Sequence, residues 1–360
     1  MNQRVLVLGA GSVGVYLGGH LAAAGMEVIF VGRQRVLDDI AEHGLRLTDL
    51  DGGETEVAPD RFGLALAPDE PEKADLVLVT VKSAATAAAV RSVAGRLRPG
   101  TPVVSLQNGI GNDTLIREIL PTSLVMAGMV MFNVVHRGQG RFHRASDGIV
   151  AIQDDPVVDR FADQFRAAGV PLRRYRDLRP VQWAKLLLNL NNPINALSGK
   201  PLREELSERD YRRCLALAQS EALAVMNTAR IRPARLTPVP PELMVRLLRV
   251  PDPIFRRVFG RVLAIDPLAR SSMADDLALG RRTEIAWLCG EIVRLGEMVG
   301  RPTPVNRRLV ELIRVAESGD PGRFGGSRLL AELTTAVAPL AVERVANTAA
   351  ATRPRRWRSG

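Results

Sequence analysis

A lysine and several asparagines share one face of a predicted helix near the middle of the chain. At about 100° per residue, Lys185, Asn189 and Asn192 fall on one side of residues 183–195, and apolar side chains crowd the other. Four of the seven residues from 189 to 195 are asparagines, which lower helix propensity relative to Lys or Glu. The pattern indicates amides placed for directed hydrogen bonds around one ammonium group. An ordinary amphipathic helix with a solvated face is the alternative.

A carboxylate stands at an apolar position of a second predicted helix, which begins near residue 282. Leu288, Ile292 and Leu295 form an apolar stripe, and Glu284 stands four residues before the first of them. A carboxylate at such a position is costly unless it is paired or lies in a cleft. Glu284 is therefore a candidate functional residue. The alternative is a plain first-turn position, where the helix dipole favours acidic side chains.

Glycines follow the first apolar run of the chain. Residues 5–8 are wholly apolar, as is typical of a strand buried on both faces of a parallel sheet. The sequence GAGSVG follows at 9–14, then a helical pattern over 13–24 and a second strand over 27–31. This order makes the glycine motif a dinucleotide-binding fingerprint, with the pyrophosphate at the helix N-terminus. The residues expected to hold the cofactor there are Gly9, Gly11, Ser12, Val13 and Gly14.

The residues that end the second strand favour one nicotinamide cofactor over the other. An acidic residue at this point would bind the 2′-hydroxyl of NAD, but the chain has Arg33 and Arg35. The planar guanidinium group makes charge-assisted bonds to phosphate oxygens. We therefore expect NADPH, with Arg33 as the first choice for the 2′-phosphate contact and Arg35 as the second. A solvated arginine pair is the alternative.

Polar side chains also follow the next two predicted parallel strands. Residues 75–81 lead to Lys82, and residues 103–106 lead to Asn108. Ligands of open α/β sheets bind beyond the carboxyl ends of the strands. Lys82 and Asn108 are thus expected where nicotinamide and substrate would meet. A surface lysine and a plain turn are the alternatives.

The alternation of strands and helices ends near residue 177, and helical patterns follow. We expect an α/β fold with an N-terminal Rossmann-type doubly wound parallel sheet over 1–177 and an all-α C-terminal domain over 178–346. A basic tail over 347–360 is expected to be disordered. His136 and His143 flank a predicted hairpin with no acid at triad spacing, which favours a structural or solvent-facing role. Further patterns predict a hairpin over 44–59, a β-segment over 142–152, and helices over 156–168, 213–228, 242–259 (with an interruption at 251–253) and 327–346.

Composition limits the classes of partner. The 360 residues are 46% apolar, enough for a core in each domain, and the net charge of +10 comes mostly from scattered arginines. Aromatic residues make up only 4%, too few for stacking on single-stranded nucleic acid, so no nucleic-acid partner is expected. No signal peptide and no apolar run of about 18 residues is present, so we expect a cytoplasmic protein without a membrane span. Cys214 and Cys289 lack metal-ligand spacing, and no metal site is predicted.

Taken together, the motifs resemble the ketopantoate reductase (2-dehydropantoate 2-reductase) family over roughly residues 3 to 315. They are GAGSVG at 9–14, VGR at 31–33, VTVKS at 79–83, QNG at 107–109, WAKLLLN at 183–189, SSM at 271–273 and TEI at 283–285. The resemblance implies a Rossmann domain joined to an all-α domain that together bind NADPH and a small 2-keto acid. Segments 233–270 and 347–360 are longer than the family usually carries.

The resemblance also implies roles for particular residues. Lys185 would be the general acid, Glu284 would hold the substrate's hydroxyl, and Ser272 its carboxylate. Asn108 and Asn189 would orient the substrate, and Lys82, Asn108 and Glu284 would also contact the cofactor. Asn192 stands one residue nearer to Lys185 than the matching asparagine of many members. Either Asn192 or Asn195 could therefore take that substrate role.

The expected activity is NADPH-dependent reduction of ketopantoate to pantoate, in pantothenate and coenzyme A synthesis. A related reductase of another small 2-keto acid is the nearest alternative, and a non-catalytic NADPH-binding sensor on the same fold is another. The assembly is expected to be a monomer or a homodimer.

Overall fold

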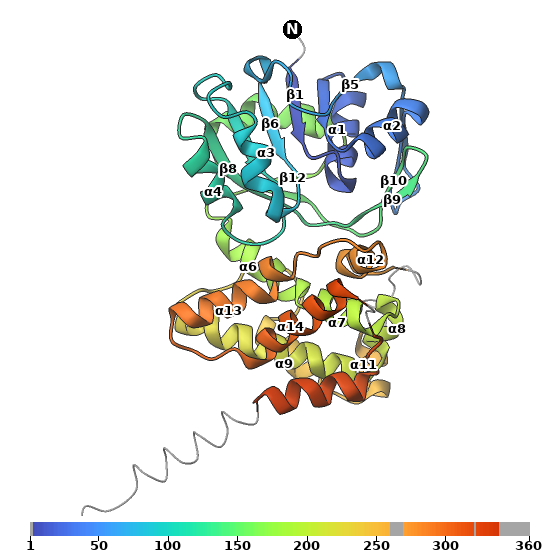
Figure 1. Cartoon of the computed structure of the whole chain (residues 1–360), viewed down its shortest axis with the longest axis vertical. Helices are drawn as coiled ribbons and strands as arrows, with labels where there is room; N and C mark the ends of the chain where they lie inside the picture. The colour runs from blue at the N-terminus through green and yellow to red at the C-terminus, as the bar shows by residue number, and fades with distance from the viewer. Residues whose placement is uncertain (1–2, 260–268, 320–321, 338–360) are drawn as a thin grey trace, which may run out of the picture. The chain divides into compact units, whose positions relative to one another are not determined.

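The computed structural model describes residues 3–259, 269–319 and 322–337. Contacts divide the chain into two compact units, Met1–Leu186 and Leu187–Gly360, and each is described by itself (Figure 1). The division between residues 186 and 187 falls within a helix that begins at Arg179. It therefore lies later in the chain than the boundary expected at 177. The expected tail over 347–360 lies outside the described residues.

An eight-stranded sheet forms the centre of the first unit, in the order β12-β11-β8-β7-β6-β1-β2-β5. Every neighbouring pair from β5 across to β8 is parallel, which confirms the predicted parallel sheet. Only β11 runs antiparallel to its neighbour β8. The strands are β1 Arg4–Leu8, β2 Glu27–Val31, β5 Phe62–Ala65, β6 Leu76–Val79, β7 Pro102–Ser105, β8 Leu124–Val130, β11 Val150–Gln153 and β12 Leu172–Tyr175.

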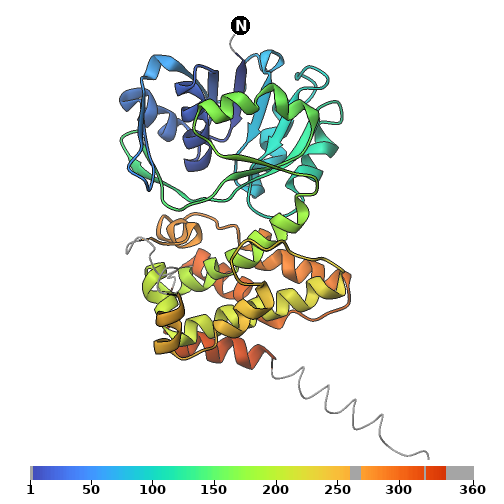
Figure 2. The same ribbon diagram turned by 180° about the vertical axis from the view of Figure 1, so that it is seen from behind.

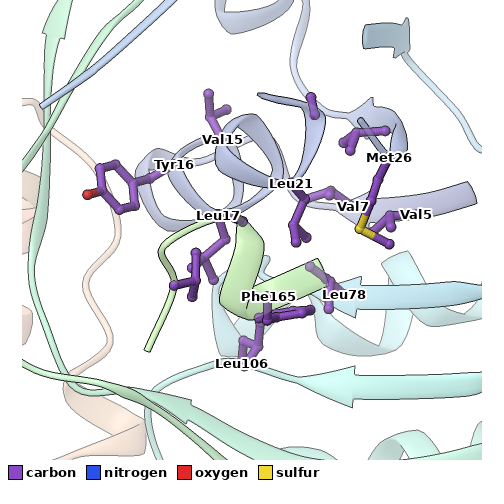
Figure 3. Close-up of a cluster of buried hydrophobic side chains, with 14 of the residues drawn as sticks. Val5, Val7, Val15, Tyr16, Leu17, Leu21, Met26, Leu78, Leu106 and Phe165 are labelled. Atoms are coloured by element: carbon purple, nitrogen blue, oxygen red, sulfur yellow. The ribbon is translucent and has the colours of Figure 1, made fainter. Parts of the chain in front are cut away.

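Helices cover both faces of this sheet, as a doubly wound fold requires. One buried cluster joins Val7, Leu17 and Phe165, and Figure 3 shows these apolar side chains of the sheet and of α1 and α5 gathered together. A second cluster, which includes Leu8 and Ile116, lies on the other face beneath α3 and α4. The helices are α1 Ser12–Ala23, α2 Gln34–His43, α3 Thr86–Arg91, α4 Asn112–Ile119 and α5 Ala162–Ala167; short 3₁₀ turns are η1 Pro59–Arg61, η2 Pro71–Lys73, η3 Ser83–Ala85 and η4 Pro156–Arg160.

A four-stranded sheet, in the order β4-β3-β10-β9, flanks the same unit. Its strands are β3 Leu45–Thr48, β4 Glu54–Val57, β9 Val134–Gly138 and β10 Arg141–Arg144, so the hairpin predicted over 44–59 is confirmed. The single β-segment predicted over 142–152 is wrong, because it divides between β10 here and β11 in the main sheet. His136 Nε2 lies 3.0 Å from Asp39 Oδ2 and His143 Nδ1 lies 2.8 Å from Thr48 Oγ1, so both histidines make structural contacts.

The described part of the second unit is built of helices without strands, as the sequence predicts, and Figure 2 shows it from behind. The predicted single helix over 183–195 is two helices, which meet at Leu190. Pro193 lies in the first turn of the second, where a proline is tolerated, but its ring would clash with the carbonyl of Asn189 in one continuous helix. The elements are α6 Arg179–Asn189, which spans the division, α7 Asn191–Ser198, α8 Leu202–Ser207, α9 Arg209–Thr228, α10 Pro241–Leu247, α11 Asp252–Phe259, α12 Ser272–Ala278, η5 Ile285–Trp287, α13 Cys289–Met298 and α14 Pro304–Ser318.

Residues 326–337 form one more helix, and the rest of the helix predicted over 327–346 lies outside the described residues. In the described part of the chain, no helix is both long enough and apolar enough to span a bilayer.

Candidate active site

The glycine loop after β1 adopts a conformation that side chains would prevent. Gly9 has φ +119°, and its amide and that of Ala10 both donate to the carbonyl of Val31 at 2.9 Å. A Cβ on Gly9 would stand 2.5 Å from the backbone nitrogen of Val81, and one on Gly14 would stand 2.2 Å from the carbonyl oxygen of Gly9. The two glycines therefore let the loop and α1 pack directly against β6 at the point where the strand order reverses.

The N-terminus of α1 is suited to an anion. Gly11 is its N-cap, makes no side-chain cap bond, and is followed by a first turn without acidic residues. A Cβ on Gly11 would meet nothing within 4 Å, so the space beside this N-cap residue is open. Backbone N–H groups and the helix dipole attract phosphate at such an end. The loop thus fits the pyrophosphate of a dinucleotide.

The end of β2, which leads to Arg33, packs against this loop. A Cβ on Gly32 would lie 2.4 Å from Cβ of Ala10, so the end of β2 is in close contact with the glycine loop. Arg33 is the next residue, is exposed, and occupies the N-cap position of α2. Arg35 is also exposed, on the first turn of α2. A guanidinium group adjacent to a dinucleotide loop fits a 2′-phosphate.

The loops after β6 and β7 are joined by a polar network. Ser83 Oγ donates to the carbonyl of Asn108 at 2.9 Å, and Asn112 Nδ2 donates to the same carbonyl at 2.9 Å. Gln107 Nε2 donates to the carbonyl of Val81 at 3.0 Å. The network fixes the backbone on which exposed Lys82 and partly buried Asn108 stand. Both residues thus lie at the carboxyl edge of the sheet, as predicted.

Lys185 reaches the same edge from α6. Its Nζ donates a hydrogen bond to the carbonyl of Val130, the last residue of β8, which neighbours β7. Lys185 is partly buried, whereas Leu186 and Leu187 beside it are 2% and 3% exposed. The first unit therefore places an ammonium and the amide of Asn108 at the ends of neighbouring strands, along the edge that holds the glycine loop.

The asparagine face continues in the second unit. Asn189 and Asn192 are partly exposed, while the apolar residues predicted on the opposite side, among them Leu190 and Ile194, are fully buried. Asn195, the alternative to Asn192, is also fully buried. Its Oδ1 accepts from the amide of Ser271, and its Nδ2 donates to the carbonyl of Lys200 at 3.0 Å and to Glu205 Oε2 at 3.2 Å. Those contacts occupy its amide with partners inside the protein.

The first turn of α12 lies against α7. Ser271 caps this helix by accepting from the amide of Ala274 at 3.2 Å, and its Oγ donates to the carbonyl of Asn192 at 3.2 Å. Ser272 is the first residue of α12. The packing thus brings Asn192 and Ser272 into one region of the second unit. The serine pair at 271–272 indicates a helix N-cap in the sequence, but no sequence pattern indicates that Ser271 contacts α7.

Glu284 has a different setting from the one predicted. It precedes the 3₁₀ turn η5, and α13 begins only at Cys289, because Leu288 has φ −109° and ψ −93°, outside the helical region. The continuous helix predicted from 282, with Glu284 on its apolar stripe, is therefore wrong. The neighbouring Thr283 donates from its amide and its Oγ1 to Glu317 Oε1, both at 2.7 Å, which fixes the backbone at partly exposed Glu284.

Comparisons with known proteins agree over most of the chain. The family model for ketopantoate reductase PanE/ApbA matches residues 5–156, and the model for its C-terminal part matches residues 177–317. A 2-dehydropantoate 2-reductase from Archaeoglobus fulgidus is 30% identical over 327 residues, which cover 88% of this chain and 99% of the relative. One from Halobacterium salinarum is 30% identical over 330 residues, which also cover 88% of this chain and 99% of the relative.

Solved structures give the same result. A PanE/ApbA family ketopantoate reductase from Ralstonia eutropha superposes with a TM-score of 0.74 at 32% identity, covering 88% of this chain and 99% of the other. D-mandelate dehydrogenase, solved with NADH, superposes with a TM-score of 0.72 at 21% identity. The match covers 88% of this chain and 99% of the other, which shows a common fold. By its matches over both parts, this chain belongs to the ketopantoate reductase PanE/ApbA family.

Proposed function

We propose that this protein reduces 2-dehydropantoate to pantoate with NADPH. The observation that carries the proposal is the position of the Lys185 ammonium at the carboxyl edge of the sheet, along which the glycine loop also lies. Family membership and the names of the relatives support the substrate. Other small 2-keto acids remain the alternative substrates.

The residues proposed to hold NADPH follow from the chemistry of its groups. The amides after Gly11 bind the pyrophosphate, and Arg33, with Arg35 as second choice, binds the 2′-phosphate. Lys82 and Asn108, at the ends of β6 and β7, contact the nicotinamide half. When bound, NADPH supplies the hydride that reduces the carbonyl carbon of the substrate.

Lys185 acts on the oxygen of that carbonyl. Reduction leaves negative charge on this oxygen, which a nearby ammonium stabilises and then protonates. The bond to the carbonyl of Val130 holds the long side chain in place before the reaction. Pre-positioning the acid lowers the entropic part of the barrier.

The remaining polar residues bind the substrate. Ser272 donates its hydroxyl to the substrate carboxylate, and Glu284 accepts from the substrate hydroxyl. Asn189 and Asn192 orient the molecule, with Asn192 preferred over Asn195. The preference rests on burial, because Asn192 is partly exposed whereas the amide of fully buried Asn195 is occupied by contacts within the protein.

Steady-state assays with NADPH and ketopantoate, beside pyruvate and phenylglyoxylate, test the proposal. We expect kcat/KM for ketopantoate to exceed the others by roughly a hundredfold or more. Preference for another 2-keto acid would move the assignment to a related reductase. Tight NADPH binding without turnover of any of the three would favour the sensor alternative and refute the proposal.

A further inference from the structure

Glu205 is a fully buried carboxyl group that the proposed reaction does not use. It lies on α8, 0% exposed, and its Oε2 accepts from Asn191 Nδ2 at 3.0 Å and from Asn195 Nδ2 at 3.2 Å. Burial, which outweighs these two bonds and is reinforced by the charge of Glu208, raises its pKa to about 8. A buried carboxyl group is costly where an apolar side chain could pack, so its place between two asparagines of α7 calls for an explanation.

The bonds of Asn195 continue from this carboxyl group to α12. Its Nδ2 faces Glu205 and the carbonyl of Lys200, and its Oδ1 accepts from the amide of Ser271 at 2.9 Å. Ser271 in turn caps α12 and donates to the carbonyl of Asn192. One unbroken series of hydrogen bonds therefore links α8, α7 and the first turn of α12.

Glu205 helps to hold the Asn195 amide in one orientation, together with the carbonyl of Lys200. An amide can turn by 180° and exchange its oxygen for its NH₂ group. With the acceptor Oε2 present, the NH₂ group faces Glu205 and the oxygen faces the Ser271 N–H. Without Glu205 Oε2, the carbonyl of Lys200 still accepts from the NH₂ group, but the amide and its bond to the Ser271 N–H are held less firmly.

We propose that Glu205, acting through Asn195 and Ser271, is a positioning residue that sets the first turn of α12 for binding the substrate carboxylate. The inference rests on the proposed function, in which Ser272 in that turn contacts the carboxylate. Glu205 touches neither substrate nor cofactor, so its effect is on KM for the keto acid. The pyrophosphate and 2′-phosphate contacts of NADPH are assigned to the other unit, so the affinity for NADPH is unaffected.

Glu205→Leu and Glu205→Gln separate this role from simple packing. Leucine removes the acceptor, whereas glutamine keeps a carbonyl oxygen for the asparagine amides. We expect Glu205→Leu to raise KM for ketopantoate roughly tenfold or more, with the Kd for NADPH unchanged, and Glu205→Gln to restore most of the lost affinity. Exposed Glu204→Gln, one residue away, is the matched control.

Amide hydrogen exchange gives a readout that does not depend on turnover. In Glu205→Leu, the Ser271 amide should exchange faster than in the wild type, and in Glu205→Gln it should be protected again. Asn195→Ala breaks the same series of bonds and should give the same rise in KM and the same exchange. The Asn195→Ala variant tests the proposal if Glu205→Leu does not fold.

An unchanged KM for ketopantoate in folded Glu205→Leu overturns the proposal. A variant that loses kcat and affinity for ketopantoate and for NADPH to the same extent, with no recovery in Glu205→Gln, overturns it as well. A wild-type protein that does not reduce ketopantoate refutes the proposed function instead. In that event, equal Ser271 protection in all variants overturns the link to α12, and faster exchange in Glu205→Leu and Asn195→Ala, but not in Glu205→Gln, supports it.

Discussion

The ammonium of Lys185 donates a hydrogen bond to the carbonyl of Val130, fifty-five residues earlier in the chain. The bond joins α6 to the carboxyl end of β8 and holds a positive charge near the loops that carry Lys82 and Asn108. The backbone carbonyl orients the ammonium through a directed hydrogen bond. An ammonium in this position can stabilise an oxygen that becomes negative during reduction.

Replacing Lys185 with alanine should lower kcat for ketopantoate by roughly a hundredfold or more, because general acid catalysis and charge stabilisation are both lost. NADPH affinity should stay within about twofold of the wild type, which fluorescence titration measures. Lys73→Ala, at the opposite end of β6, is the control and should match the wild type. A Lys185→Ala variant with wild-type kcat would exclude the acid role.

Alanine at Gly11 and at Gly9 should have opposite consequences. Gly11→Ala meets no protein atom within 4 Å, so its unfolding free energy should match the wild type while its methyl group obstructs the pyrophosphate and weakens NADPH binding. Gly9→Ala combines φ +119° with a contact of 2.5 Å to the backbone nitrogen of Val81, and should be strongly destabilised. Urea unfolding and NADPH titration on both variants measure the difference.

Gly25→Ala is the control for backbone strain alone, since Gly25 has φ +90° and open space around its Cβ position. It should cost roughly 1–2 kcal/mol, less than Gly9→Ala. Unchanged NADPH affinity in Gly11→Ala would argue against pyrophosphate at this helix end.

Arg33→Ala should change cofactor preference more than overall binding. Loss of a charge-assisted contact to the 2′-phosphate should raise the Kd for NADPH roughly tenfold or more and leave the Kd for NADH nearly unchanged. Arg35→Ala should have a smaller effect of the same kind, and exposed Arg61→Ala should have none. Equal weakening of both cofactors in Arg33→Ala would mean that its role is not 2′-phosphate recognition.

Local patterns predicted the central strands of the first unit well because these strands are short and mostly apolar. The run at 5–8, the glycine loop and the strand at 27–31 all lie within about thirty residues, so sequence order alone indicates their packing. The buried and exposed faces around Lys185 were also predictable, since a helical period separates them. Contacts distant in sequence, such as that to Val130, leave no such pattern.

The errors occurred where one residue interrupts a regular pattern. Leu288 leaves the helical region although its apolar spacing continues the stripe, which moved Glu284 out of the predicted helix. Burial of Glu205 could not be foreseen, because Glu204 and Glu208 near it are not fully buried and all three look alike in sequence. Only the asparagines of α7, brought in by tertiary packing, distinguish it.

The buried carboxyl group of Glu205 also predicts how stability depends on pH. Its pKa rises from an ordinary 4.5 to about 8 on folding, so the folded chain holds this proton over a range in which the unfolded chain releases it. Its contribution to the unfolding free energy is therefore greatest below pH 4.5 and is lost as pH rises toward 8. Asn191 and Asn195 contact the carboxyl group, and Glu208, whose charge raises this pKa, is ion-paired with Lys200.

Glu205→Gln removes this titration and keeps the shape of the side chain. Measured by urea unfolding between about pH 5 and 8, its unfolding free energy should rise relative to the wild type as pH increases. Exposed Glu204→Gln is the control and should parallel the wild type across the range. A constant difference between Glu205→Gln and the wild type at every pH would mean that the Glu205 carboxyl group does not change its protonation in the folded protein over this range.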